Sequence, residues 1–149
     1  RRTWARDLPS AIFVADVPVP ELGVLGVDAH CPPQVWGQAC CTNSWGIQQA
    51  LALRPPAEWV FVVEDDAFVF VTHLMAELQS FRSQELLYIG ASSVHTMCQL
   101  LPSCAEVHHA GGSGFVLSRP LAELLAWGTE GAAAYHTNCH AEDAHLGHF

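Results

Sequence analysis

The sequence predicts an α/β domain, because short runs typical of strands alternate with segments of helical periodicity along the chain. The most informative run is Trp59–Val63, which is short, β-branched and uninterrupted, as expected of a strand buried on both faces. Three acids, Glu64-Asp65-Asp66, follow it directly. The chain has 149 residues, half of them apolar, and shows no repeat or linker, so we expect a single domain over residues 1–149.

The segments before Trp59 predict one strand, one irregular stretch and one helix. They are Ala11–Asp16, a buried strand ending in an acid; Val17–Val35, which is rich in Pro and Gly; and Ser44–Leu53. We expect Ser44 to cap the helix, Ile47 and Leu51 to face the core, and Arg54-Pro55-Pro56 to end it.

Helices and strands also alternate after the acids. The expected elements are a helix over Thr72–Ser83 capped by Thr72, a strand over Leu86–Gly90, a long loop over Ser92–His109, a strand over Phe115–Ser118, a helix starting at Ser118-Arg119-Pro120, and the start of a helix over 141–149. In the helix that follows Phe115–Ser118, Leu121, Leu124 and Leu125 are expected to face the core.

Charge and cysteine content restrict the class of protein. A formal net charge of −9 argues against non-specific binding to nucleic acid or to an anionic membrane, although a divalent cation would permit an anionic nucleotide. Six cysteines fit an oxidising compartment with up to three disulfides, and Cys98–Cys104 is the first pair to expect. Without an apolar membrane span or a signal peptide at Arg1, we expect a fragment whose targeting segment lies elsewhere.

The acids after Val63 are the first candidate site. Three carboxylates cannot be buried unpaired without a large desolvation cost, so they must meet solvent, cations or a metal. Ligands of open α/β sheets bind at the carboxyl ends of strands, and hard oxygen ligands there suit Mg²⁺ or Mn²⁺ holding a phosphorylated substrate. The alternative is a solvated acidic turn.

Two other segments carry possible chemistry. The stretch Gly111-Gly112-Ser113-Gly114 could bring its backbone close to a sugar or diphosphate, or could simply be a tight turn entering a strand. Glu142-Asp143 could supply a general base, or could be acids at a helix start. The nine histidines include no HExxH pair, so we assign most of them to the surface or to loops, while His108-His109, just before the glycines, could contact a ligand.

In series, these segments resemble a known family. The matching segments are, in order, Arg2-Thr3-Trp4, Ile12–Asp16, Trp59–Val69, Tyr88-Ile89-Gly90, Gly111–Arg119, and Ala141-Glu142-Asp143 with Leu146-Gly147. Together they resemble the Fringe-like β1,3-glycosyltransferases, including the core-1 β1,3-galactosyltransferase group. The resemblance spans nearly the whole chain, and the series is far more specific than any one motif.

The resemblance implies a GT-A fold, a three-layer sandwich with a mostly parallel mixed sheet, here a partial catalytic domain truncated at both ends. It implies a hexosyltransferase that moves galactose or N-acetylglucosamine from a UDP-sugar to a hydroxyl of a glycan or glycoprotein, with inversion and a β1,3 linkage. The implied cofactor is Mn²⁺ or Mg²⁺. The implied location is the Golgi lumen, on a type II membrane anchor outside this chain.

The resemblance also assigns roles to residues of the DxD-type acids, the glycine segment and the C-terminal acids. They are Glu64 and Asp66 for the metal; Asp65 for the ribose or sugar; Gly112, Ser113, Gly114 and Phe115 for the donor-sugar pocket; and Asp143, with Glu142 as the fallback, for the catalytic base.

The chain departs from the family pattern in three places. The strand that contacts uridine would precede Arg1, the His that completes the metal site would follow His148, and Ile47-Gln48-Gln49 stands where a basic residue is usual. These departures motivate an alternative, a non-catalytic glycan- or protein-binding domain that keeps the fold. A third hypothesis, a metallohydrolase, requires Asp65 or Asp66 to meet two histidines.

Overall fold

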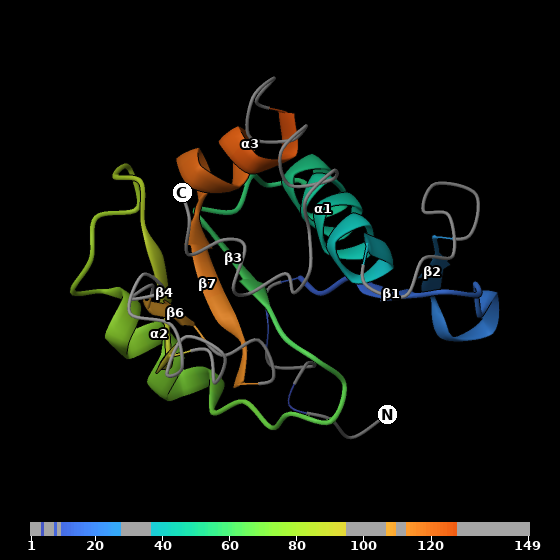
Figure 1. The fold of residues 1–149 in the computed structure, drawn as a ribbon, viewed down its shortest axis with the longest axis horizontal. Coiled ribbons are helices and arrows are strands. Elements are labelled where there is room, and N and C mark those ends of the chain that lie inside the picture. Colours follow the sequence, from blue (N-terminus) through green and yellow to red (C-terminus); the bar gives the residue numbers. More distant parts are fainter. Residues whose placement is uncertain are drawn as a thin grey trace.

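The structure is a computed structural model. It describes Trp4, Leu8 and residues 10–27, 37–94, 107–109 and 113–127. The described elements include both strands and helices, which are mixed along the chain (Figure 1). In chain order they are β1 (Phe13–Ala15), the 3-10 helix η2 (Pro20–Leu22), β2 (Val24–Gly26), α1 (Gly37–Ala52), β3 (Trp59–Val62), α2 (Val71–Leu78), β4 (Tyr88–Gly90), β5 (Ser92–Val94), β6 (Val107–His109), β7 (Phe115–Ser118) and α3 (Arg119–Trp127).

The central feature is a three-stranded sheet in the order β3-β7-β4. β7 lies in the middle and runs antiparallel to both neighbours. β3 and β4 are therefore parallel to each other, and α2 makes the crossover between them (Figure 1). The other described pairings are the parallel pair β1-β2 and the antiparallel pair β5-β6.

The expected mostly parallel sheet is not what the described strands form. The alternating pattern predicted a strand-helix-strand crossover, and β3-α2-β4 is one. The strand that fills the gap comes from later in the chain and enters at the end where β3 and β4 finish, so it runs the other way. The hydrophobic periodicity of a segment indicates which of its residues are buried. It does not indicate whether the neighbouring strand runs parallel or antiparallel.

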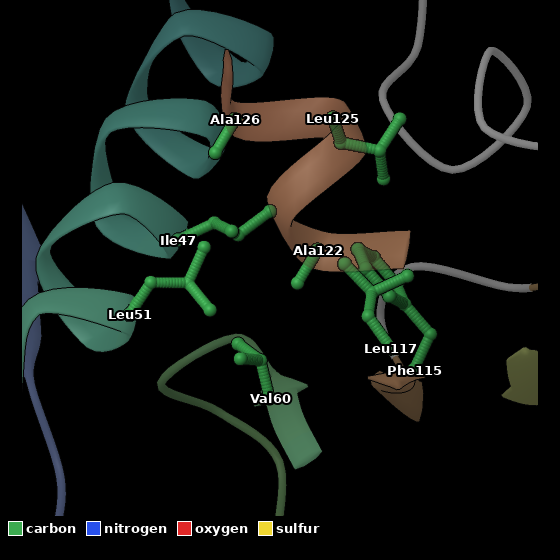
Figure 2. Packing of buried hydrophobic residues seen from close by; sticks show 8 residues of the cluster. All are labelled: Ile47, Leu51, Val60, Phe115, Leu117, Ala122, Leu125 and Ala126. Carbon is green, nitrogen blue, oxygen red and sulfur yellow. The ribbon is translucent and has the colours of Figure 1, made fainter. Parts of the chain in front are cut away.

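The core lies between this sheet and a layer formed by α1 and α3. Figure 2 shows the cluster, in which apolar side chains of both helices meet those of β3 and β7. Its members are Ile47, Leu51, Val60, Phe115, Leu117, Ala122, Leu125 and Ala126. α1 packs against α3, β3 and β1, so this one helix contacts both β3, which precedes the three acids, and the N-terminal strand β1.

The strand buried on both faces is β7, and not β3, for which the sequence predicted it. All four residues of β7 are buried, including Val116, which points to the face opposite Phe115 and Leu117. In β3 only Val60 is buried, so the expectation for Trp59–Val63 was wrong on this point. β3 lies at an edge of the described sheet, and an edge strand has a neighbour on one side only.

α1 begins earlier than predicted. It starts at Gly37, and Ser44 lies inside it with 2% of its surface exposed, so Ser44 does not cap the helix. Ile47 and Leu51 lie in the core and the helix ends at Ala52, as predicted. A serine can sit within a helix when its neighbours bury it, and local propensity does not detect this.

α2 and α3 also differ in detail from the expected helices. α2 covers Val71–Leu78 only, and Thr72 falls within its first turn, while Phe70 at the cap position makes no side-chain hydrogen bond to the helix. α3 begins at Arg119 with a proline in its first turn, as predicted. Leu125 is buried, but Leu124 is 47% exposed, so it does not face the core.

The stretch expected to be irregular contains regular structure. Between residues 17 and 27 the chain forms η2 and then β2, which pairs in parallel with β1. Gly23 makes the turn between them with φ of +69°, a left-handed conformation that glycine adopts at little cost. β1 forms as predicted, but Phe13 is 49% exposed and Asp16 is exposed, so this strand is not buried.

The two ends of the expected long loop are paired. Ser92–Val94 and Val107–His109 form the antiparallel pair β5-β6, and the expected Cys98–Cys104 pair lies outside the described residues. Cys41, in α1, is disulfide-bonded. Within the part of the chain that the structure describes, no helix has the length and apolar character needed to cross a membrane.

Candidate functional site

The acids after β3 form a tight turn, which we call the acidic turn (Glu64–Ala67). The backbone N–H of Ala67 donates to the carbonyl oxygen of Glu64 across 3.3 Å, and Asp65 and Asp66 occupy the two middle positions. All three acids are exposed to solvent. The turn thus exposes three consecutive acids to solvent at the end of the strand, as the sequence predicted.

These carboxylates are not neutralised by neighbouring cations in the described residues. The ion pairs found there join Arg82 to Glu85 and Arg119 to Glu123, both away from the turn. Three adjacent negative charges repel one another, and a divalent cation would relieve that repulsion. The acidic turn therefore keeps the charge that a cation site requires.

Trp4, near the N-terminus, contacts the acidic turn. Its indole Nε1–H donates to the carbonyl oxygen of Ala67 across 3.1 Å, and the contact is partly buried. The two residues are 63 positions apart. The sequence singled out Trp4 only as part of a family-like segment, because no local pattern predicts the partner of an indole N–H.

The glycine segment reaches the same edge of the sheet. Phe115, the first residue of β7, pairs with Val62 at the end of β3 and with Gly90 at the end of β4. Gly114 precedes it with φ of +79°, and a Cβ there would lie 2.7 Å from Cζ of Phe61. Gly114 thus lies directly beside the residues that lead into the acidic turn.

The four residues expected to line a donor-sugar pocket have different environments. Ser113 is exposed, Gly114 is buried against β3, and Gly112 lies outside the described residues. Phe115 is 1% exposed, and its ring packs edge-to-face on Tyr88 with centroids 5.4 Å apart. The side chain of Phe115 therefore belongs to the core, and only its backbone could face a ligand. Its place at the head of an uninterrupted apolar run was the signal for burial.

The residues expected to act as base, Glu142 and Asp143, lie outside the described residues, as does His148. Gln48, which stands near the family's usual basic position, has a structural partner. Its side-chain amide donates to the carbonyl oxygen of Ala126 in α3 across 2.9 Å. Gln48 therefore joins the two helices of the core layer.

The ligand chemistry of the turn fits a hard cation. Among the described residues no three His, Cys, Asp or Glu side chains lie together as a group that could hold a metal by themselves. A magnesium-type site usually takes one or two carboxylates from the protein, with water and substrate phosphates completing the shell. Exposed carboxylates of Glu64 and Asp66 match that kind of site. The metallohydrolase hypothesis needed two histidines beside Asp65 or Asp66, and the described residues contain no such cluster.

An aromatic cluster follows the acidic turn and was not predicted. Phe68 and Phe70 are 70% and 67% exposed, and their rings meet edge-to-face with centroids 5.2 Å apart. His73, in α2, stacks on Phe70 at 5.7 Å. Val69, between the two phenylalanines, is 9% exposed. All three residues are apolar, so the sequence pattern did not show which of them would be exposed.

A comparison with protein-family models finds a match to a family described as Fringe-like. The match covers residues 1–148 of the 149-residue chain, so it includes Trp4, the acidic turn, the glycine segment and the C-terminal acids. The resemblance inferred from the ordered motifs is thereby confirmed.

Proposed function

The chain belongs to the Fringe-like family, a family of glycosyltransferases, and we propose that it moves a hexose, galactose or N-acetylglucosamine, from a UDP-sugar to a hydroxyl of a glycan or glycoprotein. The proposal includes inversion, a β1,3 linkage and dependence on a divalent cation. The cation dependence rests on the acidic turn. The turn is exposed, has no ion pair with the described residues, and lies at the end of β3 that pairs with the start of β7.

Each acid has a role in this proposal. Glu64 and Asp66 hold Mn²⁺ or Mg²⁺, and Asp65 faces the ribose or the sugar. The cation supplies charge neutralisation for the departing diphosphate. The backbone at Ser113 and Gly114 borders the donor, since this segment lies beside the end of β3.

The transfer itself is a displacement at the anomeric carbon. The acceptor oxygen forms the new bond from the face opposite the diphosphate, the bond from the anomeric carbon to the diphosphate oxygen breaks, and UDP leaves with that electron pair. Asp143, with Glu142 as the fallback, takes the acceptor proton as the bond forms. Inversion follows from the single displacement.

We also propose a GT-A fold and a Golgi-lumenal location on a type II anchor outside this chain. The β3-α2-β4 crossover, with its acids at the carboxyl end of β3, supports the fold. The even number of cysteines and the disulfide bond of Cys41 support an oxidising compartment.

The test is a Mn²⁺ titration in the presence of UDP, followed by the electron paramagnetic resonance signal of free Mn²⁺. Asp66→Asn and Glu64→Gln should each weaken Mn²⁺ binding by at least about tenfold, since even outer-shell changes around metals cost that much. Glu77→Gln, an exposed acid on α2, is the matched control and should leave the affinity unchanged. Equal affinities in all four proteins would refute the metal role.

The competing function is glycan or protein recognition without catalysis on the same fold. The observation in its favour is that the described acids do not make a complete metal site by themselves. It predicts glycan binding that is indifferent to a chelator. Sugar transfer by the wild-type enzyme, measured as UDP release with acceptor present, would exclude it.

A further inference from the structure

The side chain of Trp4 donates a partly buried hydrogen bond to the acidic turn, although the two segments are far apart in the sequence. We propose that Trp4 is a positioning residue that holds the acidic turn in the conformation that binds the cation. The inference rests on the proposed function, because it takes the turn to be the cation site. No ligand contact is assigned to Trp4.

In the described ranges, the backbone of the turn makes few other hydrogen bonds. Ala67 uses its N–H within the turn, to the carbonyl of Glu64 at 3.3 Å, and its carbonyl oxygen to accept from Trp4 at 3.1 Å. The three carboxylates are exposed and form no ion pair with the described residues, so they do not hold the turn in place. Among the described residues, the hydrogen bond from Trp4 is thus the one that ties the turn to a distant part of the chain.

Electrostatics makes such a restraint useful. Adjacent carboxylates repel each other, and the repulsion favours conformations in which the turn opens and the acids separate. Asp66 directly precedes Ala67, so a rotation of the backbone at Ala67 would move Asp66 first. A donor fixed on Ala67 opposes that movement before the cation arrives, which reduces the ordering that binding must supply.

The substitution that isolates this role is Trp4→Phe. It keeps an aromatic ring at a half-buried position and removes the Nε1–H that Ala67 accepts. Trp127→Phe is the matched control, since Trp127 is 55% exposed at the end of α3. The two variants lose the same atoms, and only one loses the contact to the turn.

Two measurements on the full chain decide the matter. Hydrogen-deuterium exchange should become faster in Trp4→Phe for peptides that cover 64–67, while β7 and α1 exchange as in the wild type. Mn²⁺ affinity should weaken by about fivefold, the loss expected for one hydrogen bond. Trp127→Phe should match the wild type in both measurements.

Each other result overturns the inference. Unchanged exchange at the turn would show that Trp4 does not restrain it, and uniformly faster exchange would show a general role in stability. Faster exchange at the turn with unchanged Mn²⁺ affinity would show that the restraint does not serve the cation. If the wild type fails to bind Mn²⁺ at all, the proposed function fails, and the inference of a cation-binding conformation fails with it, even where exchange shows that Trp4 restrains the turn.

Discussion

Gly114 shows how one residue joins the fold to the candidate site. Two independent restrictions act there: φ is +79°, and a Cβ would lie 2.7 Å from the ring of Phe61 and 3.0 Å from the carbonyl oxygen of Val62. The sequence identified the glycine segment as a possible ligand contact or a tight turn. The structure assigns Gly114 a packing role against β3, next to the acidic turn.

Gly114→Ala is therefore expected to destabilise the protein strongly. The left-handed backbone costs about 1–2 kcal/mol for a residue with a Cβ, and the contact with Phe61 and Val62 adds roughly 1–3 kcal/mol of overpacking. Chemical denaturation measures the loss in free energy of unfolding.

Gly23→Ala is the control, because Gly23 has φ of +69° but nothing within 4 Å of the position of a Cβ. This variant should lose only the backbone contribution. If both variants lost the same stability, the contact of Gly114 with β3 would carry no energetic weight.

Single residues also mark the limit of prediction at the site. The exposed acids were predicted from an apolar run that ends in three carboxylates, since such charges must reach solvent or a cation. The burial of Phe115 and the bond from Trp4 to Ala67 were not predicted. The apolar run that begins at Phe115 was an available signal for its burial. The bond from Trp4 depends on which distant segments the fold brings together, and residue type alone does not contain that information.

Among the elements, β7 is the middle strand of the three-stranded sheet, and its C-terminal end is anchored by hydrogen bonds. Ser118, its last residue, exchanges two hydrogen bonds with Leu87: its N–H donates to the Leu87 carbonyl, and its Oγ accepts from the Leu87 N–H, each at 3.0 Å. Arg119 follows and donates its N–H to the carbonyl of Glu58 at 2.8 Å. The junction of β7 with α3 is thereby fixed to the starts of both flanking strands.

Ser118→Ala is expected to weaken this junction. Ser118 is fully buried, so the N–H of Leu87 would lose its partner and cost about 1–3 kcal/mol of stability. Ser80→Ala is the control, since its Oγ donates to the carbonyl of Glu77 on the exposed surface and its loss should stay within about 0.5 kcal/mol. Thermal unfolding followed by circular dichroism compares the two, and equal midpoints would contradict the role of Ser118.

Prediction succeeded for elements whose pattern is local. The strand over Phe115–Ser118, the helix that follows it and the proline-marked end of α1 were all placed correctly. β2 was missed, because its three residues lie in a stretch rich in Pro and Gly and it is stabilised by pairing with β1. The early start of α1 was also missed, since tertiary packing buries Ser44 in the middle of the helix.

For the molecule as a whole, the proposed cation site makes stability depend on a ligand. A cation that binds the folded state and not the unfolded state stabilises it by mass action, by about 2.7 kcal/mol at a concentration of one hundred times Kd. Mn²⁺ should therefore raise the Tm of the wild-type protein, and a chelator should reverse the rise.

Asp66→Asn should show a smaller rise at the same Mn²⁺ concentration, and Glu77→Gln should behave as the wild type. A rise of the same size in Asp66→Asn would place the cation elsewhere on this acidic protein, whose formal net charge is −9.

Local patterns of residues were sufficient to predict the α/β class, most of the elements, the exposure of the acidic turn and the family, because each rests on periodicity, charge or an ordered series of motifs. The antiparallel place of β7 between β3 and β4, the burial of Phe115 and the contact of Trp4 with Ala67 were decided by tertiary structure. Each of these joins segments that are far apart in the chain, and their free energy comes from packing and hydrogen bonds that exist only once those segments meet.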